Sequence, residues 1–161
     1  LPMAIMAYNK KLDKWDAGTH AGTFRGTTLS MVAGARLMKR VNTKPFLNEV
    51  KEKGDVFKKQ FEALKSECPI IGDVRGRGMM LGIEIVDPKS KEDICGARSA
   101  SGEIASELQR TCFNNGLIME KGGRNGAVMR CLTALSIPRE HLDKGIDILT
   151  ESIKTVNKKY C

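Results

Sequence analysis

The chain has 161 residues, of which 41% are hydrophobic, 29% charged and 5% aromatic, with a formal net charge of +8. This length suits one ordinary domain with a filled core, and the steady recurrence of Val, Ile, Leu and Met argues against intrinsic disorder. No stretch of about 18 apolar residues occurs, so a membrane-spanning helix is not expected. The apolar start, Leu1–Tyr8, follows no basic region and is too short for a signal peptide. Position 1 is not Met, as in a chain cut from a longer protein.

The charge excess of 27 Lys and Arg over 19 Asp and Glu raises the question of an anionic partner such as nucleic acid. Lysines such as Lys51 and Lys58 alternate with Glu49, Glu52 and Glu62, which is typical of a solvated helix face. Few aromatic residues are present for base stacking. We therefore expect no nucleic-acid partner.

The cysteines and histidines are too dispersed for a metal site. No Cys-x-x-Cys pair occurs, and His20 and His141 lie far apart in the sequence. We expect no metal, and reduced, buried thiols in a cytoplasmic protein, at the five cysteines Cys68, Cys95, Cys112, Cys131 and Cys161.

The first part of the chain predicts three elements. The apolar run Pro2–Tyr8 is expected to be a short buried strand, and the polar segment Asn9–Gly22 a loop. Apolar and small residues recur at three- and four-residue steps over Thr27–Val41, which predicts a helix.

A second, longer helix and a strand follow. The helix is expected to begin at Pro45, to be interrupted by Gly54 at a cost of about 1 kcal/mol, and to end before Pro69. Alternating apolar residues over Met79–Val86 predict a strand, and Lys89–Ser101 reads as an exposed loop.

The last part of the chain predicts two helices with two short strands between them. Ile104–Cys112 forms the first helix, which Gly116 terminates in the left-handed conformation. Leu117–Glu120 and Ala127–Leu132 are the strands, and the final helix starts at Pro138. The order from Phe46 onward is α-β-α-β-β-α, which predicts an α+β fold: a small sheet with helices packed on it.

Two glycine-rich segments resemble nucleotide-binding motifs but lack their context. The glycines of Arg75–Gly82 precede a strand, whereas a dinucleotide motif needs them between a strand and a helix N-terminus, so a tight turn is favoured. Gly122–Gly126 contains Asn125-Gly126, a strong hairpin-turn signal. No nucleophile, base and acid are assembled anywhere in the sequence.

The segment His20–Thr27 places small residues, hydroxyls and an arginine directly before a helix. Backbone N–H groups and a threonine hydroxyl at such a place can bind a phosphate. The same residue types also serve as a helix N-cap. The residues alone leave both interpretations open.

Several blocks in one order resemble the class III (ornithine/4-aminobutyrate-type) pyridoxal-phosphate aminotransferases, most closely the members that act on diaminobutyrate and 2-oxoglutarate. The resemblance covers the whole chain and rests on Leu1-Pro2, the His20–Gly26 block, the Val74–Glu84 run, Gly116–Glu120, and Gly122–Arg124 followed by Val128–Arg130. Because the blocks keep their order and spacing, together they are more specific than any single motif.

The resemblance implies a fold, a cofactor and an assembly. Residues 1–44 would be a remnant of the large pyridoxal-phosphate-binding α/β domain, and residues 45–161 the C-terminal small domain of a fold-type I enzyme. It implies a cytoplasmic homodimer, without a membrane partner, that transfers an amino group between 2,4-diaminobutyrate, or a related ω-amino acid, and 2-oxoglutarate. The Schiff-base lysine would lie upstream of Leu1, so no catalytic residue is expected here and the chain alone is expected to be inactive.

The resemblance also implies three site residues. Thr23 and Gly22 would bind the cofactor phosphate, with Thr23 reaching across the dimer interface, and Arg130 would bind the substrate carboxylate. The physical case for Arg130 is its planar fork, which meets a carboxylate with two parallel hydrogen bonds. Its apolar neighbours in sequence argue against full exposure. The sequence departs from the family's pattern shortly after Arg130. Thr133-Ala134 occupy positions where the family has Pro-Pro, and prolines would have fixed the backbone angle φ there.

One interpretation from another class stays open beside the enzyme. A basic binding or interaction module without a catalytic role would account for the net charge equally well. Pyridoxal-phosphate absorbance in a longer protein would argue against it, and a salt-dependent gel shift would support it.

Overall fold

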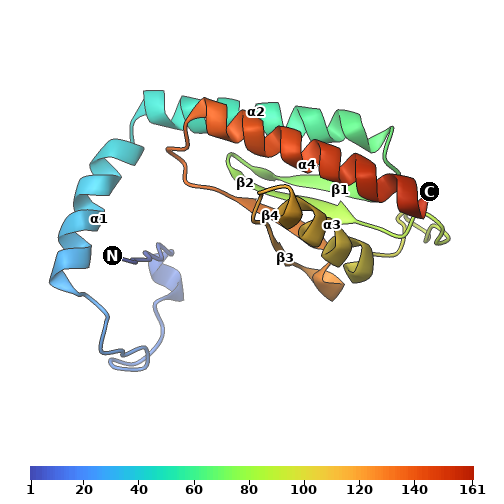
Figure 1. Ribbon diagram of the computed structural model, residues 1–161. Helices are drawn as coiled ribbons and strands as arrows, with labels where there is room; N and C mark the ends of the chain where they lie inside the picture. The colour runs from blue at the N-terminus through green and yellow to red at the C-terminus, as the bar shows by residue number, and fades with distance from the viewer. The chain divides into compact units, whose positions relative to one another are not determined.

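The computed structural model in Figure 1 describes every residue from Leu1 to Cys161. The chain forms two compact units, Leu1–Leu47 and Asn48–Cys161. The domain limits 1–44 and 45–161 stay a prediction.

The first unit contains little regular structure besides one helix. A short 3-10 turn, Lys10–Leu12, precedes α1, which spans Thr28–Val41. The helix prediction is confirmed within one residue. The strand expected at Pro2–Tyr8 is wrong, because these residues are exposed and no neighbouring strand is there to accept and donate backbone hydrogen bonds. Met3 instead lies against Gly34 of α1, where any larger residue would collide with its side chain.

The second unit is a four-stranded antiparallel sheet packed against three helices (Figure 1). The strand order is β1-β2-β4-β3, and neighbouring strands pair antiparallel throughout. The elements in chain order are α2 (Lys44–Lys65), β1 (Ile71–Arg77), β2 (Met80–Ile85), α3 (Gly102–Asn114), β3 (Glu120–Gly122), β4 (Val128–Leu132) and α4 (Arg139–Tyr160). The predicted α+β class, a small sheet with helices packed on it, is confirmed.

One hydrophobic core joins the sheet to all three helices. The alternation of each strand sends Leu81, Ile83 and Ile85 of β2 and Met129 of β4 into it. The helices contribute residues at helical spacing: Phe57, Phe61 and Leu64 from α2, Ile104, Leu108 and Cys112 from α3, and Leu142, Ile146, Leu149, Ile153 and Val156 from α4. The other face of the sheet carries the polar residues of the same strands.

The strand β1 is not predicted from the sequence. We expect a tight turn over Arg75–Gly82, whereas the backbone stays extended to Arg77 and turns only at Gly78-Met79. Val74 and Ile83 pair in register, as do Gly76 and Leu81. Pairing with β2 therefore makes a strand of a sequence whose glycines, Asp73 and Arg75 are typical of a loop.

Other boundaries differ by a few residues. Helix α2 runs through Gly54 without interruption. The third strand begins at Glu120 rather than Leu117, and its hairpin to β4 turns at Asn125 and Gly126, which have φ of 58° and 63°. Gly116 has a φ of 87°, so the predicted left-handed termination of α3 is confirmed.

Candidate functional site

A cavity of about 350 Å³ lies between α4, the residues leading into β3, and the end of β4. Its interior is apolar, because α4 presents Leu142, Ile146 and Leu149 and α2 presents Phe57. The polar residues of its lining are Glu120, Arg130, Thr133 and His141. An apolar hollow with a few polar groups is the usual form of a small-molecule site.

Arg130 lies in the middle of β4 and is one of the residues that line this cavity. Met129 and Cys131 point into the core, so strand alternation turns Arg130 to the opposite, polar face. There its register partners are Gly82 on β2 and Glu120 on β3. The Arg130 side chain is 44% exposed, and its apolar sequence neighbours say little about its burial because they lie on the other face of the strand.

Glu120 is the acidic partner of Arg130 in this structure. The Nη1 atom of Arg130 lies 3.1 Å from Oε1 of Glu120, and the Glu120 side chain is 63% exposed. A guanidinium has five N–H donors, so an ion pair at Nη1 leaves the Nε edge for a second carboxylate. Sequence reasoning did not single out Glu120 as this partner, although the predicted hairpin already placed the two strands side by side.

Two other ionisable groups of this lining are the Cys131 thiol and the His141 imidazole. Burial raises the pKa of the Cys131 thiol to about 12, so the thiol stays protonated and unreactive at neutral pH. His141 is exposed at the start of α4, with Nε2 3.7 Å from Glu140 Oε1. The cavity therefore has the features of a binding site for an acid rather than those of a nucleophilic centre.

The loop before α1 is the second candidate site, and it belongs to the first unit. Its residues form a turn in which the Arg25 amide donates to the Gly22 carbonyl at 3.1 Å. The Arg25 guanidinium bonds the His20 carbonyl and lies 3.2 Å from the His20 ring nitrogen Nδ1. Thr23 lies between them with an exposed side chain.

The N-terminus of α1 is free of side-chain caps. Thr27 occupies the N-cap position, but its hydroxyl donates to the Phe24 carbonyl at 3.1 Å instead of bonding the helix. A cavity of about 300 Å³ lies here, lined by Pro2–Ala4, Phe24–Thr27, Ser30 and Met31. Residues 20–31 contain no carboxylate. Free helix N–H groups, hydroxyls and an arginine without a nearby acid form a donor set that fits a phosphate group.

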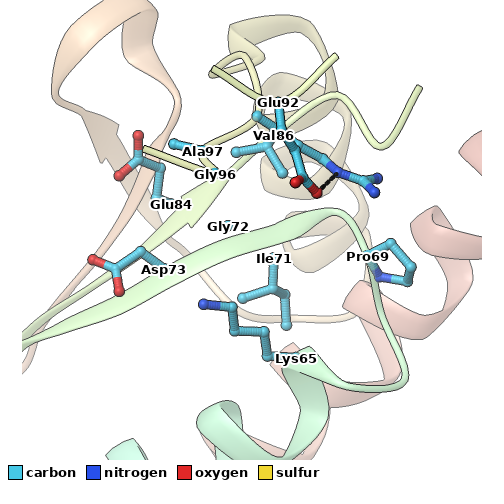
Figure 2. Close-up of a pocket in the computed structure, with 11 residues that line it drawn as sticks. Lys65, Pro69, Ile71, Gly72, Asp73, Glu84, Val86, Glu92, Gly96 and Ala97 are labelled. Carbon is cyan, nitrogen blue, oxygen red and sulfur yellow. Dashed lines mark hydrogen bonds and ion pairs between the residues drawn. The ribbon is translucent and has the colours of Figure 1, made fainter. Parts of the chain in front are cut away.

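Figure 2 shows another cavity, of about 320 Å³, beside β1, the end of β2 and the loop that follows it. Its carboxylates and Arg98 have partners within the chain, whereas Lys65 has none. Glu92 lies 3.5 Å from Arg98 Nε, and Asp73 and Glu84 share Arg75, whose Nη1 is 2.9 Å from Asp73. In Figure 2 the carboxylates of Asp73 and Glu84 lie on neighbouring strands. This pairing is typical of a solvated structural cluster.

The remaining chemistry-bearing groups are dispersed. All five cysteines are free; Cys95 and Cys161 are exposed, so the expectation of buried thiols is wrong for these two. No cluster of three or more His, Cys, Asp or Glu side chains is arranged to hold a metal ion. None of the helices combines the length and the hydropathy needed to cross a bilayer.

Comparison with known proteins decides the family. The family model described as "Aminotransferase class-III" matches residues 1–153, nearly the whole chain. The chain belongs to the class III aminotransferases. Curated relatives of this class III chain include the diaminobutyrate–2-oxoglutarate aminotransferase of Haemophilus influenzae, which is 37% identical over 95% of this chain. The enzyme of the same name from Rhizobium meliloti is 36% identical over 99% of it. In both cases the class III chain spans 34% of the relative's length, about a third of these enzymes.

Solved structures share the class III fold. A transaminase from the marine bacterium Virgibacillus superposes with a TM-score of 0.71 at 17% identity, covering 92% of this chain and 33% of that one. The ornithine aminotransferase of Toxoplasma gondii, described with partial occupancy of PLP at its active site, superposes with a TM-score of 0.67 at 19% identity. It covers 90% of this chain and 31% of its own. These likenesses show that the chain shares its fold with solved aminotransferase structures, in agreement with the predicted fold-type I architecture.

Proposed function

We propose that this chain is the C-terminal part of a pyridoxal-phosphate-dependent aminotransferase that moves an amino group between 2,4-diaminobutyrate and 2-oxoglutarate. The observation that carries the proposal is Arg130, a residue in the lining of an apolar cavity whose half-exposed guanidinium has only one nitrogen engaged by the protein. The curated relatives named for this reaction support the choice of substrates.

The role we propose for Arg130 is to bind the substrate carboxylate. Arg stays charged at every physiological pH, and its planar guanidinium donates two parallel hydrogen bonds to a carboxylate. The Nε edge opposite the Glu120 contact is the part of the guanidinium available for this. When its carboxylate is bound to Arg130, an amino acid or a 2-oxo acid keeps its reacting carbon at a fixed distance from β4.

We further propose that the loop before α1 binds the cofactor phosphate through Thr23, Gly22 and the first N–H groups of α1. The donors present, and the lack of a carboxylate in residues 20–31, fit this anion. Pyridoxal phosphate supplies the electron sink on which amino transfer depends. By family resemblance the active form is a homodimer in which Thr23 reaches the neighbouring protomer's cofactor. Five unpaired cysteines support a cytoplasmic location.

The test replaces Arg130 with Lys in the complete enzyme that carries this chain. We expect KM for both amino donor and 2-oxoglutarate to rise at least tenfold, with the spectrum of bound cofactor unchanged. Arg139→Lys is the matched control, because Arg139 is an exposed arginine paired with Asp143 on α4. If both KM values stay within about twofold of wild type, less than 0.5 kcal/mol of binding, Arg130 is not the anchor.

A second test concerns the chain by itself. Lys53, its one buried lysine, already donates to Glu49 and to the Ile137 carbonyl, and the family's Schiff-base lysine would lie upstream. We therefore expect the 161-residue chain with added cofactor to produce no glutamate above background. Turnover by the chain alone would contradict this part of the proposal.

A further inference from the structure

Lys53 is a charged side chain in the interior of the second unit. It projects from the middle of α2 and is only 6% exposed. A buried ammonium is unfavourable unless it is paired and hydrogen-bonded. Its Nζ has two acceptors: the carboxylate of Glu49, one turn earlier on α2, and the carbonyl oxygen of Ile137 at 2.8 Å. The second bond joins residues 84 positions apart in sequence.

Ile137 belongs to the segment 133–137, which connects β4 to α4. Within the segment the bonds are local: the Thr133 hydroxyl donates to the Ala134 carbonyl at 3.1 Å, and the Ile137 amide donates to the same carbonyl at 3.0 Å. The bond from Lys53 is the one side-chain hydrogen bond that ties this segment to another element. No proline fixes the backbone within residues 133–137.

The same segment forms one wall of the cavity beside Arg130. Thr133 and Ile137 line that cavity, and so does Phe57, which follows Lys53 by one turn on the same face of α2. Helix α2 therefore contributes to the cavity twice. Phe57 is part of its lining, and Lys53 donates a hydrogen bond to Ile137, at the end of the segment 133–137 that borders α4.

We propose that Lys53 is a positioning residue for the carboxylate site, holding residues 133–137 at a fixed distance from Arg130 through the Ile137 carbonyl. This inference rests on the proposed function of Arg130. Without the ammonium, the connection between β4 and α4 would keep only its own turn and the packing of the Ile137 side chain against the core, so the cavity wall would sample more positions. Binding of the acid would weaken, whereas the chemistry that follows binding would not change.

The experiment compares Lys53→Met, Lys53→Arg and the exposed control Lys58→Met in the complete enzyme. Methionine keeps the length of the side chain and removes the donor, whereas arginine keeps a donor. We expect amide hydrogen exchange at Ile137, whose amide is hydrogen-bonded within residues 133–137, to accelerate at least tenfold in Lys53→Met. We also expect KM for 2-oxoglutarate to rise at least fivefold with kcat within twofold. Lys53→Arg should recover most of both effects, and Lys58→Met should behave as wild type.

The two readouts separate the possible failures. If the wild-type enzyme does not transaminate, the proposed function fails, while the exchange measurement still tests the link between Lys53 and the wall. Unchanged exchange at Ile137, or a loss of kcat with KM unaltered, would overturn the positioning role. If Lys53→Met does not fold, Lys53→Gln takes its place, because Gln removes the charge and is too short to reach the Ile137 carbonyl as Lys53 does. It should accelerate the same exchange at least threefold, and no acceleration would again overturn the proposal.

Discussion

Gly54, in the middle of α2, lies directly against the backbone of Gly78 in the turn between β1 and β2. A β-carbon at residue 54 would lie 2.6 Å from the carbonyl carbon of Gly78, far inside van der Waals contact. A glycine costs about 1 kcal/mol in a helix interior relative to alanine. Here the close approach of helix and turn outweighs that cost, which explains why a 22-residue helix carries a glycine near its centre.

We predict that Gly54→Ala destabilises the protein, by about 2 kcal/mol, because the helix must move away from the turn. The matched control is Gly145→Ala on α4, where a β-carbon would meet only Leu117 Cδ1, at 3.8 Å. The control should be neutral or stabilising by up to about 1 kcal/mol. Urea denaturation measures both, and a Gly54→Ala protein as stable as wild type would contradict the packing argument.

Replacing Glu120 tests whether it competes with substrate for Arg130. Glu120→Gln removes the carboxylate but keeps the shape of the side chain. Exposed ion pairs contribute about 0.2–1 kcal/mol, so the KM for 2-oxoglutarate should fall by up to about fivefold. Glu151→Gln, which breaks the exposed pair with Lys154 on α4, is the control and should leave KM unchanged. A rise in KM for Glu120→Gln would instead mean that Glu120 holds Arg130 in place.

Thr23→Ala tests the proposed phosphate site in the loop before α1. A hydroxyl bonded to a phosphate contributes about 1.5–3 kcal/mol, so the cofactor dissociation constant of the complete enzyme should rise by about one to two decades. Thr43→Ala is the control, because the Thr43 hydroxyl already donates to the Arg40 carbonyl at the far end of α1. Equal dissociation constants for wild type and Thr23→Ala would remove Thr23 from the cofactor site.

Tyr160 gives the protein a pH dependence at alkaline values. Its hydroxyl donates to Glu107 Oε2 at 2.7 Å, and this bond to a carboxylate, helped by partial burial, raises the Tyr160 pKa to about 12 from its ordinary 10. The folded state therefore keeps a proton that the unfolded state loses. The resulting stabilisation is fully present below pH 10 and disappears as pH rises through about 12.

The corresponding prediction concerns Tyr160→Phe, which lacks the ionisable hydroxyl. Its free energy of unfolding should fall less steeply than that of wild type between pH 10 and pH 12. Denaturation at a series of pH values measures this difference. Identical slopes would show that the contact with Glu107 does not persist in solution.

The helices could be predicted from the sequence because their signals are local. Apolar residues at helical spacing, Pro45 at the start of α2 and Gly116 after α3 set those boundaries within a few residues. The strand β1 could not be predicted, because only Ile71 and Val74 of its residues are buried and its regularity comes from pairing with β2. The opposite error at Pro2–Tyr8 has the same origin: apolar residues without a partner strand do not form one.

For the candidate site too, some features could be predicted from the sequence and others could not. Arg130, Thr23 and Gly22 could be proposed from the sequence through blocks that resemble a family. The cavity beside Arg130, the ion pair with Glu120 and the bond from Lys53 to Ile137 could not, because they depend on sheet register and on the docking of α2 against a distant loop.

The sparse burial in α1 has a consequence for how the chain melts. That helix buries only Ser30 and Gly34, while Leu29, Val32 and Leu37 are exposed. An isolated helix of 14 residues is marginal in water, so α1 should unravel gradually and without a heat-absorption peak of its own. Residues 48–161, with their single core, should give the one sharp calorimetric transition. A calorimetric enthalpy measured on this chain would therefore report on about 114 residues rather than 161.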